Sequence, residues 1–338
     1  MPGAHCVDER GPRILGGAPP YGWKDVELIV CGIAGYFHKT SDNEPVGRVL
    51  LTMLEALGRR GPDSAGLALF GAAERAGEIC WIKLPEDASP AESERDVVER
   101  LGLVCHLVRS ERRGGLIRAV VVRSSTVREF CAGVERGVGF EVVSLGSSLE
   151  LTKQVGSPGN LDDSFDVGAF RGTHGIGHTR LSTESKVDLS HSQPFWARGV
   201  PDLATVHNGH ITNYDRLRRI FEQAGYRFFT HNDSEVIAVY LADRLAQGRT
   251  LEEAVAGSLD DFDGSFTYLA ATPTELAFAR DPFAFKPLIT VETDRYVAIA
   301  NEEVAIRAAL SDEGVAHEPT GHVYRIWRRA AISAHVAA

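Results

Sequence analysis

Four short segments of the sequence carry side chains whose types could do chemistry. Cys31 follows an apolar run, and a thiol becomes a nucleophile when a nearby base accepts its proton. Asn208 and Gly209 supply an amide side chain and a backbone N–H, two donors of the kind that can stabilise an oxyanion. Arg180 has a planar guanidinium that can bind a carboxylate through two parallel hydrogen bonds. Asp233 stands at the start of an apolar helical pattern and adds a negative charge.

Each of these segments also has a purely structural explanation. A lone cysteine beside an apolar run is usually a small buried hydrophobe, and Asn-Gly is a strong signal for a hairpin turn. The Asn-Asp-Ser-Glu run at 232–235 is explained by the capping of a helix. His174 and His178 have the spacing of two metal ligands on a helix. The glycines around them disfavour a helix and no third ligand follows at a useful spacing, so we expect no metal site.

Taken in order along the chain, these segments resemble the class II glutamine amidotransferases, which include glucosamine-6-phosphate synthase, asparagine synthetase and the large subunit of glutamate synthase. The segments that carry the resemblance are CGIAGYF at 31–37, RRGPDSAG at 59–66, GHTRLST at 177–183, VHNGHITNY at 206–214, NDSE at 232–235, DGSF at 263–266, ARDPFAFKPL at 279–288 and IANE at 299–302. We interpret the last three as sheet and turn structure. A series in the family's order is far more specific than any single motif.

The resemblance implies a role for each catalytic residue. In that family the cysteine is residue one of the working enzyme, because a free α-amino group with a pKa of ~7.7–8.0 can accept the thiol proton. Cys31 is therefore the expected nucleophile, and Asn208 and Gly209 match the oxyanion hole. Since Val30 precedes the cysteine here, we expect residues 1–30 to be an N-terminal extension that is either a cleaved propeptide or the product of a misassigned start.

The same resemblance implies L-glutamine as the substrate. Arg180 matches the arginine that holds the α-carboxylate of glutamine, and Asp233 matches the aspartate that pairs with its α-ammonium group. Arg60 lies in the turn that closes over the nucleophile, and Thr183 ends the strand motif that contains Arg180. Both are expected to bind substrate.

Hydrophobic periodicity indicates the elements that must position these residues. Helices are predicted at 46–57, 91–101, 125–136, 214–223, 234–246 and 251–259, and strands at 26–33, 79–84, 119–122, 138–145, 174–179, 204–207, 265–270, 277–279 and 296–300. The family resemblance implies an α+β Ntn-hydrolase fold, a four-layer αββα sandwich with two antiparallel sheets. We expect residues 31–338 to form this amidotransferase domain, with residues 71–166 as an inserted small α/β subdomain.

Composition excludes several other classes of protein. The formal net charge is -10 and no long run of Lys or Arg occurs, so we expect no binding to nucleic acid. No apolar run approaches the ~18 residues that a membrane span needs, so we expect no membrane association. The five cysteines are odd in number and form no C-x-x-C pair, which argues against a disulfide framework. A reducing cytoplasm is the expected location.

We expect a glutaminase subunit that passes ammonia to a synthase on another chain. The insertion and the segment HSQPF at 191–195 resemble the stand-alone amidotransferase subunits of split glutamate synthases and of N-methylglutamate synthase. The resemblance implies two partner subunits, a flavin-dependent synthase subunit and a β-helix subunit. We expect FMN on the synthase subunit and no cofactor on this chain, because it has no G-x-G-x-x-G or P-loop phosphate motif.

Two alternatives stay open at this point. One is a non-catalytic assembly subunit of the same complex, which would follow if residues 1–30 remained attached and Cys31 lacked its α-amine. The other is an Ntn amidohydrolase that acts on a different amide. The pair Arg180 and Asp233 disfavours the second, because both charges match an α-amino acid. The identity of the amine acceptor, ammonia or methylamine chemistry, would be set in the partner's active site.

Overall fold

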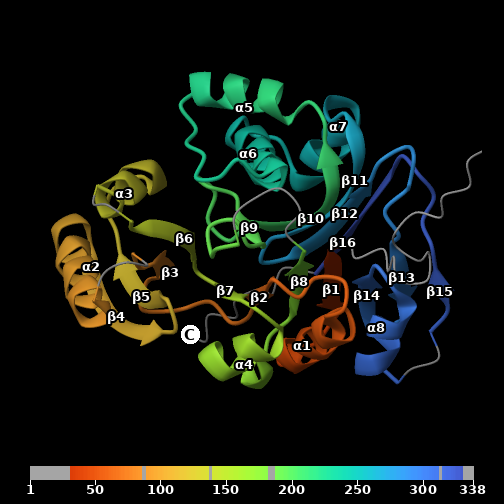
Figure 1. The fold of residues 1–338 in the computed structure, drawn as a ribbon, viewed down its shortest axis with the longest axis horizontal. Helices are drawn as coiled ribbons and strands as arrows, with labels where there is room; N and C mark the ends of the chain where they lie inside the picture. Colours follow the sequence, from red (N-terminus) through yellow and green to blue (C-terminus); the bar gives the residue numbers. More distant parts are fainter. Residues whose placement is uncertain (1–30, 86–88, 137–138, 182–186, 312–313, 330–338) are drawn as a thin grey trace, which may run out of the picture.

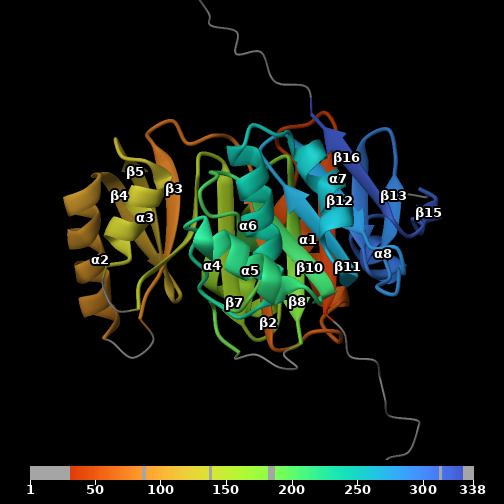
Figure 2. The same ribbon diagram turned by 90° about the horizontal axis from the view of Figure 1, so that it is seen from above.

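Two β-sheets packed face to face, with helices on both outer faces, make up the main body of the protein (Figures 1 and 2). The structure is a computed structural model, and it describes residues 31–85, 89–136, 139–181, 187–311 and 314–329. The helix, sheet, sheet, helix order confirms the predicted αββα sandwich. The predictions for residues 1–30 lie outside the described residues.

The first sheet has seven strands in the order β15-β13-β14-β1-β8-β2-β7. Their bounds are β1 Gly32–His38, β2 Ser64–Phe70, β7 Leu149–Val155, β8 His174–Arg180, β13 Ile289–Glu292, β14 Tyr296–Ala300 and β15 Ala316–His317. Helices α1 (Val46–Ala56) and α8 (Glu303–Ala309) cover its outer face. Gly175 and Gly177 let α1 lie close to β8, because a Cβ on either would come within 3.1 Å of a leucine side chain of α1.

The second sheet has five strands in the order β16-β12-β11-β10-β9, all antiparallel to their neighbours. Their bounds are β9 Phe195–Trp196, β10 Ala204–Ile211, β11 Gly264–Ala271, β12 Glu275–Arg280 and β16 Val323–Arg328. Helices α5 (Tyr214–Gln223), α6 (Asp233–Ala246) and α7 (Leu251–Asp261) form the layer on this side (Figure 2). The side chain of Asn232 caps α6 by accepting a hydrogen bond from Ser234 N, so Asp233 begins the helix at a fixed place.

The inner faces of the two sheets share an apolar core that reaches into the inserted unit. Ile33 of β1, Val206 of β10 and Leu269 of β11 are all fully buried in it. Because β1 pairs with β8 and the inner face of β1 packs on β10, the start of β1, the end of β8 and the middle of β10 converge at one end of the sandwich. That convergence brings the predicted site residues together.

A separate four-stranded sheet with the order β4-β5-β3-β6 lies beside the main body (Figure 1). Its strands are β3 Glu78–Lys83, β4 His106–Arg113, β5 Leu116–Val122 and β6 Glu141–Gly146, with helices α2 (Pro90–Val104) and α3 (Val127–Val134). The next strand, β7, also falls within residues 71–166 but pairs with β2 in the seven-stranded sheet. Helix α4 (Gly159–Phe165) and the 3₁₀ turn Val167–Ala169 then lead back to β8.

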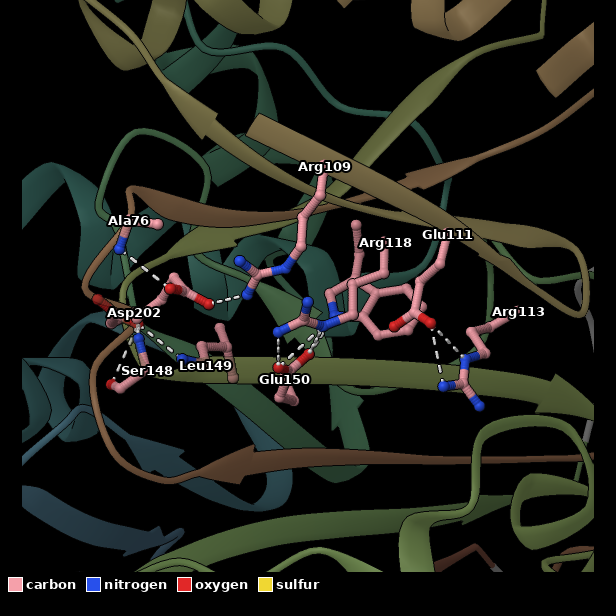
Figure 3. A network of polar contacts seen from close by, with 11 residues as sticks. Ala76, Arg109, Glu111, Arg113, Arg118, Ser148, Leu149, Glu150 and Asp202 are labelled. Atoms are coloured by element: carbon pink, nitrogen blue, oxygen red, sulfur yellow. Dashed lines mark hydrogen bonds and ion pairs between the residues drawn. The ribbon is translucent and has the colours of Figure 1, made fainter. Parts of the chain in front are cut away.

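Polar contacts join this four-stranded sheet to the main body (Figure 3). Arg118 of β5 donates from Nε to Oε1 of Glu150 on β7 over 3.0 Å. Asp202, in the loop before β10, accepts hydrogen bonds of 2.8 Å from the backbone N–H groups of Ser148 and Leu149. The turn between β6 and β7 is therefore fixed to the second sheet, because one carboxylate satisfies several backbone donors.

Candidate active site

Five of the predicted site residues line a single pocket of about 300 Å³: Cys31, Arg180, Asn208, Gly209 and Asp233. Cys31 immediately precedes β1, Arg180 ends β8, Asn208 lies within β10, and Asp233 begins α6. Residues separated by up to 202 positions are thus gathered at one end of the sandwich. A pocket of this volume is at the lower limit of the usual range for small-molecule sites.

The thiol of Cys31 lies against the end of β8. Its Sγ is 3.6 Å from the carbonyl oxygen of Leu181. Burial raises the pKa of the Cys31 thiol above its ordinary value, and the nearby Arg180 guanidinium opposes that rise. A thiol with a raised pKa is mostly protonated at neutral pH, so nucleophilic attack from this position requires a base.

Asn208 and Gly209 are part of a strand and do not form the hairpin turn that their sequence alone would favour. Asn208 pairs with Thr267, and Gly209 pairs with Phe266. Gly209 has a φ of +138°, and a Cβ on it would lie 2.2 Å from Ser265 O, so only glycine fits here. Asn208 Nδ2 donates to the carbonyl oxygen of Cys31 over 2.9 Å, which places an amide donor beside the thiol residue.

Arg180 and Asp233 bring opposite charges to the same pocket. Arg180 is 4% exposed, and the side chain of Asp233 is 12% exposed. Asp233 Oδ2 accepts a hydrogen bond of 2.8 Å from Ile211 N and lies 3.5 Å from His210 Nδ1. A guanidinium and a carboxylate in one small pocket are complementary to the carboxylate and ammonium of an α-amino acid.

Arg60 lies behind the cysteine and does not line the pocket. Its Nε lies 3.4 Å from the carbonyl oxygen of Cys31, to which it donates, and its guanidinium forms an ion pair with Glu302. Arg60 therefore contacts the backbone of Cys31, and the pocket is lined by other residues. Thr183 lies outside the described residues.

Asn301 holds the strand that follows the cysteine, a role that the sequence interpretation missed. Its Oδ1 accepts a hydrogen bond from Ile33 N, and its Nδ2 donates to Pro287 O over 2.7 Å. Asn301 is only 2% exposed. The segment 299–302, which we interpreted from the sequence as sheet and turn structure, therefore holds two residues near the cysteine. Asn301 contacts Ile33, and Glu302 pairs with Arg60.

A buried polar network beside Asn208 was also missed, and its members Gln193, His207 and Ser234 line the same pocket. Gln193 accepts from His207 N over 2.6 Å and donates back to His207 O over 3.0 Å. The Gln193 amide also donates to Ser234 Oγ over 3.2 Å, and His207 Nδ1 lies 2.8 Å from the same hydroxyl. These contacts link β10 to the first turn of α6, so they set the spacing between Asn208 and Asp233. The available signal was the polar segment at 190–193, which lies between Leu189 and Pro194.

His174 and His178 do not come together as a pair of metal ligands. His174 Nε2 lies 2.6 Å from Thr272 O, and its ring stacks on Phe70 with the centroids 4.6 Å apart. His178 Nε2 lies 3.1 Å from His207 O. Burial lowers the pKa of each imidazole to about 3, so both are neutral groups of the core. In the described part of the chain, no three His, Cys, Asp or Glu side chains gather as metal ligands.

Comparison with known proteins identifies the family. A family model described as a glutamine amidotransferase domain matches residues 178–308. A candidate glutamine amidotransferase of Methanothermobacter thermautotrophicus is 35% identical over 303 residues, which are 87% of this chain and 98% of that protein. The glutamine amidotransferase-like protein GlxB of Rhizobium meliloti is 39% identical over 279 residues, 82% of this chain and 91% of that protein.

A solved structure shows the same fold. The glutamine phosphoribosylpyrophosphate amidotransferase of B. subtilis superposes with a TM-score of 0.55 and 18% identity, over 89% of this chain. The present chain spans about half of that enzyme, since the match covers 50% of its length. Among the described residues, no helix is long and apolar enough to cross a membrane. The pocket, the fold and the two relatives agree, and the chain belongs to the class II glutamine amidotransferases.

Proposed function

We propose that this protein hydrolyses L-glutamine to glutamate and ammonia through a thioester on Cys31. The observation that carries the proposal is the pocket in which Cys31, Asn208, Arg180 and Asp233 meet. Arg180 and Asp233 would hold the α-carboxylate and the α-ammonium of glutamine. The side-chain amide of glutamine then extends toward Cys31, where the nucleophile and the oxyanion donors lie.

The chemistry needs a base for the thiol, and we propose the α-amine of Cys31 itself. Removal of residues 1–30 would create that amine, whose pKa of ~7.7–8.0 lets it accept a proton near neutral pH. The amine takes the thiol proton, and the thiolate attacks the amide carbon of glutamine. The oxyanion that forms would accept hydrogen bonds from Gly209 N–H and from Asn208 Nδ2, which has a second N–H besides the one given to Cys31 O.

The intermediate collapses by breaking the bond between carbon and nitrogen. The α-ammonium of Cys31 returns its proton to the leaving nitrogen, so ammonia departs and a thioester remains. Water, activated by the same amine, then attacks the thioester and releases glutamate with the thiol restored. Arg60 would act as a positioning residue in this scheme, through its contact with the Cys31 carbonyl.

We further propose that the ammonia is passed to a partner enzyme of the glutamate synthase or N-methylglutamate synthase kind. The support is the resemblance of the insertion and of residues 191–195 to the stand-alone subunits of those complexes. FMN would be carried by a flavin-dependent subunit, beside a β-helix subunit. In that arrangement ammonia would condense with a carbonyl group of the acceptor to give an imine and water, and reduced FMN on the partner would supply the two electrons for reduction of the imine.

Purification from the native host tests both parts of the proposal separately. Glutamate and ammonia should appear in equal amounts from glutamine. The Cys31→Ala variant should still fold but form neither product. Absence of glutamine hydrolysis in a chain that begins at Cys31 would refute the hydrolase. A native complex that contains an aminosugar or purine synthase, and no flavoprotein, would refute the partner but leave the hydrolase standing.

A further inference from the structure

A second pocket lies where the inserted unit meets the main body, away from the glutamine site. It is formed by one face of α3 and by residues 198–199 and 225–227 of the main body. None of its lining residues is shared with the glutamine pocket. Its volume is about 140 Å³. An apolar cavity of ~150 Å³ is large enough to take up benzene, so this pocket has room for a ring-sized group.

One wall of the pocket is apolar. It is lined by Val127, Cys131 and Ala132 of α3 and by Tyr226 of the main body. Cys131 is 6% exposed, and burial raises the pKa of its thiol to about 11, so the thiol is neutral. A wall of this kind favours an uncharged, compact body of carbon atoms, because contact with it removes apolar surface from water.

The other wall is charged and its charges do not balance. Three arginines, Arg128, Arg198 and Arg227, face one carboxylate, Glu135. Glu135 is almost fully buried and pairs with Arg198, while Arg227 Nη1 lies 3.5 Å from its second oxygen. Arg128 Nη2 donates to the carbonyl of Gly225 over 2.5 Å, and no acidic side chain of the described residues is paired with it. The pocket therefore has an excess of positive charge.

Two of the guanidinium groups are held in place before any ligand binds. Arg198 and Arg227 both stack on the ring of Phe229, with their Cζ atoms 3.9 and 4.5 Å from its centroid. The third, Arg128, is an exposed side chain that donates to Gly225 O. Side chains that are already ordered lose little conformational freedom on binding, which favours affinity for a small anion.

We propose that this pocket binds a small organic carboxylate whose apolar part is about the size of a benzene ring. The carboxylate would lie between Arg128 and Arg227, and the apolar part would lie against Cys131 and Ala132. A bare inorganic anion leaves the apolar wall unused. A neutral ring leaves the excess positive charge unpaired.

Calorimetric titration of the whole chain with benzoate tests the proposal, because benzoate has both features. We expect saturable binding with a Kd of about 1 mM or lower. Benzamide, which has the same shape without the charge, and inorganic phosphate should each bind at least about tenfold more weakly, a difference of ~1.4 kcal/mol. Excess L-glutamine should leave benzoate binding unchanged, since the glutamine pocket is separate.

Variants of the lining distinguish this site from any other. Arg128→Gln and Arg227→Gln should each weaken benzoate binding at least about fivefold, and Ala132→Phe should abolish it by filling the apolar end. Arg219→Gln, an exposed arginine of α5 outside the pocket, is the matched control and should have no effect. If Ala132→Phe does not fold, the two arginine variants decide.

Several results would overturn the proposal. They are the absence of saturable benzoate binding, equal binding of benzamide or phosphate, displacement of benzoate by glutamine, and benzoate binding that survives both arginine substitutions. The titration needs no catalytic activity, so it gives an answer whether or not the proposed glutamine hydrolysis is correct.

Discussion

Replacing Asp233 with asparagine removes one negative charge from the glutamine pocket and leaves the size of the side chain unchanged. Asp233 Oδ2 accepts the N–H of Ile211 over 2.8 Å, and the amide oxygen of asparagine can accept the same bond. Asn232, which caps α6, is untouched. We therefore expect the variant to fold. It should lose only the negative charge that pairs with the α-ammonium group of glutamine.

The size of the effect follows from the burial of the carboxylate. The side chain of Asp233 is 12% exposed, so water screens its charge only in part. A hydrogen bond to a charged group contributes about 1.5–3 kcal/mol, which corresponds to a rise of roughly 10- to 150-fold in KM for glutamine. The value of kcat should change little, because the α-ammonium group is bound equally in the ground state and the transition state.

Glutamate release measured over a range of glutamine concentrations separates KM from kcat. Asp243→Asn is the matched control, because it makes the same charge change on the same helix outside the glutamine pocket. The control should leave KM within about twofold of the unsubstituted protein. A KM for Asp233→Asn that stays within threefold, or a fall confined to kcat, would refute the role assigned to this carboxylate.

Two further substitutions and one change of pH give independent tests of the site and the core. Asn208→Ala should lower kcat by about 10²–10³ through the loss of one oxyanion donor, and a fall below threefold in ammonia release at saturating glutamine would contradict that role. Burial lowers the pKa of His174 and His178 to about 3 in the folded protein, whereas in the unfolded chain both keep the ordinary value of ~6.5. As the pH falls through ~6.5, these histidines therefore take up protons only in the unfolded chain, which favours unfolding. Urea unfolding should show a loss of ~1.4 kcal/mol for each histidine between pH 7.5 and 5.5, whereas a flat profile would be inconsistent with neutral buried rings. Asn301→Ala leaves the buried N–H of Ile33 and the partly buried carbonyl of Pro287 without their side-chain partner. It should lower the free energy of unfolding by about 2–5 kcal/mol, a change that denaturant titration measures directly.

Helices with a clear apolar stripe could be predicted from the sequence. The interval 214–223 matches α5, and the interval 46–57 matches α1 to within one residue. The strand β4 (His106–Arg113) was missed, because it is an edge strand with exposed, charged side chains and no apolar alternation. The strand β7 (Leu149–Val155) was missed as well, and its pairing with β2 could not be read from local pattern, since the two strands are about 85 residues apart.

The residues of the candidate site also fall into two groups, those that could be predicted from the sequence and those that could not. Cys31, Asn208, Gly209, Arg180 and Asp233 were found because each lies in a motif of the family, and all five line one pocket. The supporting residues were not found, because their partners are backbone groups far along the chain. Asn301 and Ile33, for example, are 268 positions apart and meet only because β14 lies beside β1. A sequence shows which donors and acceptors exist, but the pairing of strands decides which of them meet.

One mass-spectrometric measurement tests directly whether Cys31 is the nucleophile of a glutaminase. Protein purified from its native host is treated with an electrophilic analogue of glutamine, and its first residue and its labelled residue are then determined. We expect a chain that begins at Cys31, is labelled on that residue alone and is protected from labelling by excess glutamine. A native chain that begins at Met1, or a label on Cys80, Cys105 or Cys131, would contradict the assignment of Cys31 as the nucleophile.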